Sequence, residues 1–465
     1  MTSARDAWTL CIDFGTAFSK AAAAPTGAWS RFHPEDVRPL MLSQENGANP
    51  FLLDSAVFID EDRILFGRAA IERADALAYK KRQALRSFKT LLSVSDLDRV
   101  LNTVAPASID PHRVFPMRDL VVLYLAYLLA ATDRAIRSDP VLSAASSIER
   151  RYAAPAWRSG DSGGLHASVV RLFGEAEALR AALGDKILAP QGVTLKGVGD
   201  ALPGALAHPR SVYMGLVFEA TAAAAYTSIG LEESASHMIV VDMGAGTTDI
   251  AAVARSGGRM EELPAARVTL KQAGDFIDKV VANIVLDANG WARSPEQQSV
   301  LWRLLMRHMR DIKESLFADG RAMLRHENRT VSVTLRDLEK DKDFKVFLKN
   351  LEKAYDESMA AVRDSAIERK RRGIQSIAVG GGANAPFIQA LLKRKPSRSG
   401  KLVIEARPAT PEWAFAPEFR GNLAPVFPQL SIAIGGALAP ETMLAARSEL
   451  SLAAAGRNGI PAAPD

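Results

Sequence analysis

The sequence contains one pattern twice, as Cys11-Ile-Asp-Phe-Gly-Thr-Ala-Phe-Ser-Lys20 and as Val240-Val-Asp-Met-Gly-Ala-Gly-Thr-Thr-Asp249. Each copy is a short apolar run that ends in an aspartate, followed by a turn with glycine and a second run of small residues. This order predicts a strand, a turn and another strand. Glycine lets backbone N–H groups approach a phosphate, and an aspartate at a strand end can hold hydrated Mg²⁺. The repeat therefore predicts a two-lobed protein in which two turns hold one nucleotide.

Other interpretations of these glycine turns stay open at the level of residues. A tight hairpin with Asp-x-Gly is a common structural turn, and a single copy would favour that interpretation. A third turn, Gly380-Gly-Gly-Ala-Asn-Ala-Pro386, fits either an ordinary strand-to-helix connection or a backbone that approaches a flat ring or a phosphate. The sequence has no P-loop, and the second copy lacks the third glycine of a dinucleotide fingerprint.

Length and composition are those of a folded globular protein. The chain has 465 residues, of which 48% are hydrophobic and 24% are charged. This length is enough for roughly two to four domains with buried cores. The net charge of +5 is spread along the chain, so nucleic-acid binding is not expected. The seven histidines have no ligand spacing, and no metal other than magnesium is indicated.

The apolar segments predict neither a membrane span nor a secretion signal. The longest one, Leu120–Ala131, is too short to cross a bilayer and predicts a core helix. We expect that helix over 119–137, with Asp119 as its N-cap. The first residues lack a signal-peptide core, which predicts a cytoplasmic protein without membrane contact. Cys11 is the only cysteine, so no internal disulfide can form, and its place in a strand predicts plain packing.

Two further segments carry weaker expectations. Residues 67–92 are helical in character. Residues 184–211 are rich in glycine and proline with weak periodicity, and they predict a surface insertion.

Taken in order, the motifs resemble the ATPase domain of the heat-shock protein 70 (DnaK-like) chaperones, within the actin and sugar-kinase superfamily. The resemblance covers most of the chain, from about Trp8 to Leu438. The most diagnostic stretch is Phe218-Glu-Ala-Thr-Ala-Ala-Ala-Ala-Tyr226, because the filament-forming relatives differ there. The other matching segments are the first phosphate motif at 12–16, the second at 241–249, upper-lobe pieces at 273–278 and 309–316, and the adenosine motif at 377–386.

The resemblance implies an α/β, actin-like ATPase fold. Two lobes, each built on a duplicated ribonuclease-H-like β-sheet with flanking helices, would have a cleft between them. The expected parts are lobe I at 1–233 with a small upper subdomain at about 36–117, lobe II at 234–428 with an upper subdomain at about 273–364, a helix of lobe I at 429–445, and a flexible tail at 446–465.

The same resemblance implies a site for ATP or ADP with Mg²⁺. Asp13 and Asp242 would hold the ion through water, and Glu219 would order water beside it. Contacts to phosphate oxygens would come from Thr16 and Thr247 and from the backbone of Gly15, Ala17, Gly244, Ala245 and Gly246. Lys313 and the backbone of Gly380, Gly381 and Gly382 would grip the adenosine. From the residues alone, a solvated helix lysine is the preferred interpretation of Lys313, and Glu219 has an alternative interpretation as a carboxylate at a helix start.

Some positions depart from the family pattern. The family has a lysine that reaches the γ-phosphate after a Gly-x-Ala-Ala segment, and here Ile71 stands in its place. An aliphatic side chain neither orients water nor neutralises charge, so hydrolysis should be slow or absent. Lys89 could stand in from a neighbouring helix. Gly382 and Asn384 replace the family's serine and arginine in the adenosine motif, and Gln429 replaces an aspartate near the ion.

The expected function is that of an ATP-binding protein of the chaperone type. A slow ATPase would change its contact with an unknown protein partner according to the bound nucleotide. The peptide-binding domain of the family has no counterpart after Ala439, so direct holding of peptides is not expected. The alternatives are a protein that forms actin-like filaments and, with less support, a small-molecule kinase of the same superfamily.

Overall fold

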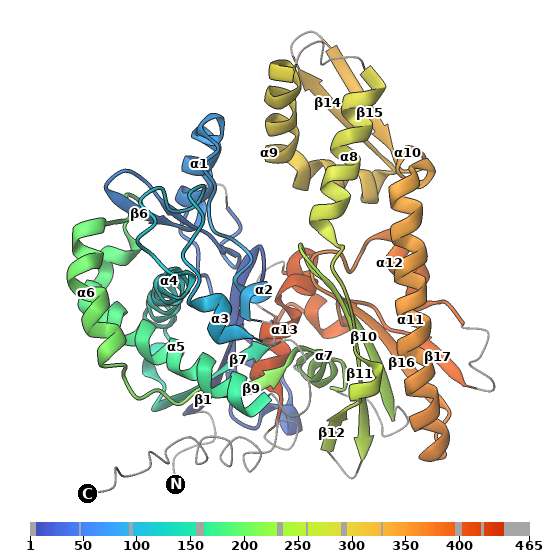
Figure 1. Cartoon of the computed structure of the whole chain (residues 1–465). Helices are drawn as coiled ribbons and strands as arrows, with labels where there is room; N and C mark the ends of the chain where they lie inside the picture. The colour runs from blue at the N-terminus through green and yellow to red at the C-terminus, as the bar shows by residue number, and fades with distance from the viewer. Residues whose placement is uncertain are drawn as a thin grey trace, which may run out of the picture. The chain divides into compact units, whose positions relative to one another are not determined.

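The computed structural model describes residues 6–440 except 46–47, 93–95, 155–161, 230–235, 257–258, 290–294, 327–328, 396–401 and 420–422. The chain divides into two compact units, each with its own helices and strands (Figure 1). The first unit comprises Met1–Glu233, Val253–Pro264 and Thr410–Asp465, and the second comprises Ser234–Ala252 and Ala265–Ala409. The fold is therefore of the mixed α/β class.

The first unit is built on a mixed sheet in the order β3-β2-β1-β7-β9, with β4 paired to β2. Strand β1 is antiparallel to β2 and parallel to β7, which is parallel to β9. A smaller sheet has the order β5-β6-β8. The strands are β1 (Ala7–Phe14), β2 (Phe18–Pro25), β3 (Arg38–Pro39), β4 (Leu53–Asp54), β5 (Val57–Ile59), β6 (Arg63–Phe66), β7 (Ser147–Ala154), β8 (Val193–Thr194) and β9 (Gly215–Phe218).

Helices cover both faces of the larger sheet, as the alternation of side chains along β1 shows. Trp8, Leu10, Ile12 and Phe14 join the core formed with α4 and α5, whereas Cys11 points to the other face, against Gly436 of α13. The helices of this unit are α1 (Gly67–Ala76), α2 (Phe88–Leu92), α3 (Leu97–Leu101), α4 (Met117–Ser138), α5 (Ser162–Leu183), α6 (Leu195–Ala207), α7 (Glu219–Thr227) and α13 (Phe427–Leu438).

The structure corrects three sequence predictions in this unit. The core helix is confirmed, because 120–131 is buried along its whole length, but α4 begins at Met117 with Pro116 as N-cap, and Asp119 lies inside its first turn. The helix expected over 67–92 ends at Ala76. The expected surface insertion at 184–211 contains β8 and α6, and α6 packs its apolar face on α5.

The second unit has a sheet in the order β12-β11-β10-β16-β17, with β13 paired to β11. Strand β16 is parallel to both β10 and β17. Strand β11 begins in the second unit and ends in the first. Strand β12 (Arg259–Glu262) lies within the residues of the first unit. The other elements of this sheet and of the second unit are β10 (His237–Met243), β11 (Thr248–Ser256), β13 (Val268–Leu270), β14 (Arg321–His326), β15 (Arg329–Thr334), β16 (Gly373–Val379), β17 (Val403–Ala406), α8 (Gly274–Asn289), α9 (Pro295–Asp319), α10 (Leu335–Lys340), α11 (Lys342–Glu368) and α12 (Pro386–Leu392).

The two large sheets share one strand order. In each, the first strand along the chain lies between the second strand and a later parallel strand, and the second strand also pairs with two short strands. Asp13 and Asp242 occupy the same place in this scheme, one residue before the end of the first strand. The two copies of the sequence pattern therefore have equivalent positions in two similar sheets.

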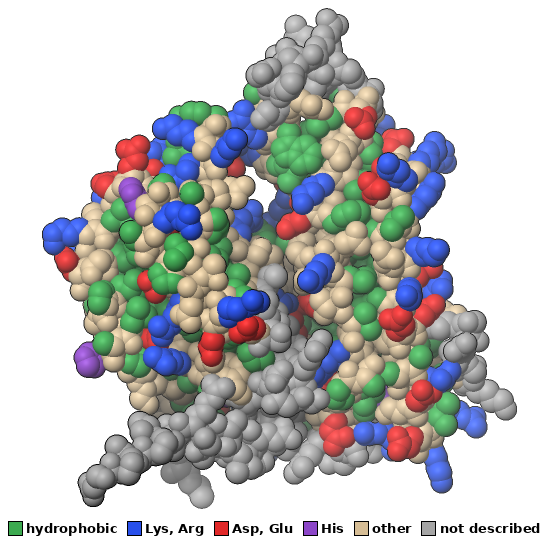
Figure 2. Space-filling view, viewed as in Figure 1, with side chains coloured by type: hydrophobic (Ala, Val, Ile, Leu, Met, Phe, Trp, Pro, Cys, Tyr) green, Lys and Arg blue, Asp and Glu red, His purple; other side chains and the backbone are tan. Residues whose placement is uncertain are grey.

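Charges and apolar segments complete the description. On the face shown in Figure 2, Lys and Arg side chains are interspersed with Asp and Glu. Among the described residues, no helix combines the length and the apolar character that a membrane crossing requires. The expected tail at 446–465 and the expected lobe boundary at 233–234 lie outside the described residues.

Candidate functional site

The first turn joins β1 to β2, and its geometry explains its glycine. The N–H group of Gly15 donates to the carbonyl oxygen of Phe18 at 3.1 Å. A Cβ atom at Gly15 would lie 2.6 Å from that oxygen, which excludes any larger residue. The Asp13 residue before the turn is only 4% exposed. The hairpin therefore presents a buried carboxylate beside a tight turn.

Lys20 is a member of this site that the sequence analysis left without a role. It lies directly opposite Asp13 in the β1–β2 register, and its Nζ is 2.5 Å from Asp13 Oδ2. The same Nζ donates to the carbonyl oxygen of Phe18 in the turn at 3.3 Å. The signal was present in the sequence, because a hairpin closed by this turn puts the two residues in register. A positive charge thus stands at the first turn.

Helix α2 brings a second lysine to the first turn. The N–H group of Ser87 donates to the carbonyl oxygen of Thr16 at 3.3 Å, which ties the start of α2 to the turn. Two residues later, Lys89 Nζ lies 2.8 Å from Oε2 of Glu219, the first residue of α7. The side chains of Lys89 and Glu219 are 13% and 8% exposed. The structure thus joins these two residues into one nearly buried ion pair.

A hydroxyl cluster under the turn holds α2 in place. The Tyr124 hydroxyl lies 2.5 Å from Ser19 Oγ and 3.0 Å from Ser55 Oγ. The ring of Tyr124 stacks on Phe88, with 4.2 Å between the centroids and 5° between the planes. Burial raises the pKa of Tyr124, so the phenol stays protonated. One side chain of α4 therefore fixes both β2 and the helix that carries Lys89.

The surroundings of the Cys11 thiol show that Asp13 and Glu219 lie in the same part of the first unit. Burial raises the pKa of its thiol, the negative charges of Asp13 and Glu219 raise it further, and Arg151 opposes them. Both carboxylates therefore lie within electrostatic range of one sulfur atom. Glu219 follows β9, which is parallel to β7 and, through β7, to β1. Asp13 and Glu219 thus belong to the same edge of the sheet, where the carboxyl ends of its parallel strands meet.

The second turn repeats the hydrogen bond of the first. The N–H group of Gly244 donates to the carbonyl oxygen of Thr247 at 3.1 Å. The preceding Asp242 is 9% exposed, and residues 244–247 are half-buried. The hydroxyl group of Thr247 donates to Asp249 Oδ2 at 2.9 Å. Its proton is therefore engaged, and the backbone of the turn is the part that can donate to a ligand.

The third glycine turn lies against the second. Gly380 has φ +83°, and a Cβ atom there would lie 2.4 Å from Asp242 Oδ1. The N–H group of Gly382 donates to the carbonyl oxygen of Met243 at 3.0 Å. This approach follows from the pairing of β10 with β16, in which Asp242 is opposite Val379. Gly381, between these two glycines, is exposed.

Lys313 of α9 also adjoins the second turn. Its Nζ donates to the carbonyl oxygen of Gly274 at 3.5 Å and forms an ion pair with Asp278. The N–H groups of Gly274 and Asp275 donate to the carbonyl oxygens of Gly244 and Ala245 at 3.2 and 2.8 Å. The start of α8 therefore links Lys313 to the turn. In the second unit, the residues predicted for the site therefore all lie at or beside the second turn.

The structure shows the environments of three residues that differ from the pattern of the chaperone family. Ile71 packs on the small apolar cluster around Ala56 and Phe58, where an aliphatic side chain is suited. The Oε1 atom of Gln429 is buried and has no hydrogen-bond partner among the described residues. Asn384 is exposed.

Asp13 and Asp242, taken separately, each have the chemistry to hold a hydrated magnesium ion. Among the described residues, no three His, Cys, Asp or Glu side chains form a cluster that could hold a metal ion. Mg²⁺ usually keeps several waters and is held by one or two carboxylates together with phosphate oxygens. Asp13 and Asp242, each a single carboxylate at a glycine turn, fit that requirement.

Comparisons of the sequence with protein-family models and with curated proteins find no match. The function is therefore argued from the geometry of the two turns and their surroundings.

Proposed function

We propose that this chain is an ATP-binding protein of the heat-shock protein 70 type, with an actin-like fold in which both lobes contribute to one Mg-ATP site. One observation carries the proposal. Asp13 and Asp242 stand one residue before the end of equivalent strands, and each turn is closed by a 3.1 Å hydrogen bond from the second residue after the aspartate to the fifth. Two unrelated structural turns would have no reason to agree in strand order, position and closure.

The first unit would act on the phosphates. Transfer of a phosphoryl group depends mainly on positioning and on neutralisation of charge. Lys20 and Lys89 place two ammonium groups at the first turn, and the backbone N–H groups of Thr16 and Ala17 would donate there, whereas that of Gly15 already donates to the carbonyl oxygen of Phe18. Glu219, which is paired with Lys89, would orient the attacking water. Asp13 and Asp242 would hold Mg²⁺ through water, and the ion would supply further positive charge to the phosphates.

The second unit would hold the rest of the nucleotide. The half-buried backbone N–H groups of Ala245 and Gly246 would donate to phosphate oxygens, whereas that of Gly244 already donates to the carbonyl oxygen of Thr247. The turn at 380–382 and Lys313 would bind the adenosine, because both adjoin the second turn. With Ile71 in the usual lysine position, we expect slow hydrolysis. The nucleotide would then serve as a timer that changes contact with a protein partner.

Calorimetry with Mg-ATP, run beside phosphate-release kinetics, tests the proposal. Asp13→Asn and Asp242→Asn remove one carboxylate from each unit, and each should weaken Mg-ATP binding by about tenfold or more. Asp185→Asn is the matched control, because that side chain is 87% exposed. Without magnesium, the difference between the variants and the native chain should shrink.

The outcomes separate the candidate functions. Binding without phosphate release would make the chain a nucleotide-gated scaffold. Sedimentation that depends on ATP would favour the filament former. If the native chain binds no Mg-ATP, or if only one of the two aspartates matters, the shared site is refuted.

A further inference from the structure

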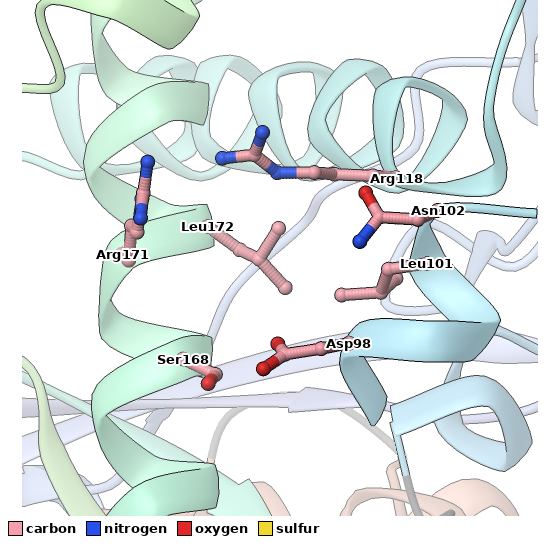
Figure 3. A pocket seen from close by; sticks show the side chains of 7 residues that line it. All are labelled: Asp98, Leu101, Asn102, Arg118, Ser168, Arg171 and Leu172. Atoms are coloured by element: carbon pink, nitrogen blue, oxygen red, sulfur yellow. The ribbon is translucent and has the colours of Figure 1, made fainter. Parts of the chain in front are cut away.

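A cavity of about 320 Å³ lies between α3, the start of α4 and the first half of α5 in the first unit (Figure 3). Leu101 and Leu172 form its apolar part. Its polar lining consists of Asp98, Asn102, Arg118, Ser168 and Arg171. No residue assigned to the nucleotide site lines it. A volume of this size is within the range of small-molecule sites.

One side of the cavity carries two arginine side chains, and a buried glutamate holds both of them in place. Arg118 Nη2 and Arg171 Nε both donate to Oε1 of Glu175, with a distance of 3.0 Å for Arg171. The Glu175 side chain is fully buried, at 0% exposure. Two guanidinium groups thus share the Glu175 carboxylate, and Asp119 is a second acidic residue within electrostatic range of Arg118. Each arginine uses one donor atom there, and among the described residues the other guanidinium N–H groups have no acceptor.

The opposite side carries a carboxylate. In Figure 3, Asp98 and Ser168 lie at one end of the cavity and Arg118 at the other, with the two leucine side chains between them. Within the described part of the chain, the side chains of Asp98, Asn102 and Ser168 make no hydrogen bond and no ion pair. The cavity therefore presents separated charges of opposite sign across an apolar middle.

We propose that this cavity binds a small zwitterion of the amino-acid class. The carboxylate of the ligand would accept hydrogen bonds from Arg118 and Arg171, since a guanidinium group matches a carboxylate with two parallel donors. The ammonium group would pair with Asp98, and Ser168 and Asn102 would complete its hydrogen bonds. An aliphatic side chain would lie on Leu101 and Leu172. Glu175 acts through the two arginines, whose donor groups it orients before the ligand arrives.

Calorimetric titration of the full chain with three probes tests this proposal. L-leucine has both charges, L-leucinamide lacks the carboxylate, and N-acetyl-L-leucine lacks the ammonium group. L-leucine should bind at least about tenfold more tightly than either analogue. Asp98→Asn should remove its advantage over N-acetyl-L-leucine, and Arg118→Gln should remove its advantage over L-leucinamide.

The controls keep the result independent of folding and of the nucleotide. Arg99→Gln, on the same helix as Asp98 and 80% exposed, should leave the titration unchanged. Asp98 is exposed, so its variant should fold even if Arg118→Gln does not. All titrations are made without ATP, so failure of the nucleotide proposal leaves them intact. Equal binding of L-leucine and N-acetyl-L-leucine, or no saturable binding in the millimolar range, would overturn the proposal.

Discussion

Lys89 Nζ lies 2.8 Å from Glu219 Oε2 although 130 residues separate them in the chain. Both side chains are nearly buried, and removal of one partner from a buried pair leaves an uncompensated charge. Lys89→Met should therefore destabilise the protein by about 3 kcal/mol. The double variant Lys89→Met/Glu219→Gln should recover most of that loss. Urea unfolding of the two single variants and the double variant measures it.

The same variants test catalysis. If the pair serves phosphoryl transfer, all three should slow phosphate release, including the double variant whose stability is restored. If a stable double variant releases phosphate at the normal rate, the Lys89–Glu219 pair has a structural role and no role in catalysis.

Gly380→Ala should distort the second turn, because the new methyl group would push against the side chain of Asp242. The substitution puts a Cβ atom 2.4 Å from Asp242 Oδ1 at a residue with φ +83°. Gly320 is the matched control, because it has φ +74° and open space around it. Gly320→Ala should cost only the backbone strain, about 1 kcal/mol. Gly380→Ala should cost more and should also weaken Mg-ATP binding in the calorimeter. Equal effects of the two substitutions on stability and binding would contradict this account of the turn.

Gly435→Ala should disrupt the contact of α13 with α7. A Cβ atom at Gly435 would lie 1.9 Å from the carbonyl oxygen of Ala222, which is backbone and cannot rotate away. We expect a loss of about 3 kcal/mol in the free energy of unfolding. Gly199→Ala, in α6 with nothing nearby, should instead stabilise the protein by about 0.5 to 1 kcal/mol. Thermal and urea unfolding compare the two. A neutral Gly435→Ala would show that the two helices are less closely packed.

Stability should fall in acid because of His237. Burial, together with the charges of Arg369 and Arg371, lowers the pKa of this histidine to about 4. The unfolded chain takes up the proton near pH 6.5, whereas the folded chain resists it until about pH 4. The stability gained from the neutral ring is therefore present above pH 6.5 and is lost as the pH falls toward 4, by up to about 3 kcal/mol.

Urea unfolding at a series of pH values measures this dependence. His237→Asn retains a hydrogen-bonding group between Ser236 and Ser365 but does not titrate, so its acid slope should be smaller. His33→Asn, on the surface, should keep the native slope. Identical slopes for all three proteins would exclude His237 as the cause.

The sequence predicted best where the signal is local. An apolar run that ends in Asp-x-Gly specifies its own strand and turn, and both copies lie where strand and turn were expected. The same hairpin register also predicts that Lys20 lies opposite Asp13, although the sequence analysis gave Lys20 no role. Lys89 could be offered only as a guess, because its approach to Glu219 depends on the stacking of Phe88 on Tyr124. No pattern along the chain reports that contact.

Helix α6 illustrates the opposite failure. Its glycines and the internal Pro203 lower its intrinsic helix propensity, so the segment was interpreted as an insertion. Val198, Leu202 and Ala205 are nevertheless buried. Tertiary packing of one apolar face therefore outweighs local propensity, as it does in most protein helices. For α4, the sequence predicted Asp119 as the N-cap, whereas the N-cap is Pro116, three residues earlier.

The sheltered thiol of Cys11 has a practical consequence. It is the only cysteine, it is fully buried against Gly436, and its raised pKa keeps it protonated. Thiol reagents need a thiolate that solvent can reach. A cysteine introduced on the surface of each unit would thus be labelled without interference from the native one. A fluorophore pair attached in this way could report, in the unmodified background, whether adding nucleotide changes the separation of the two units.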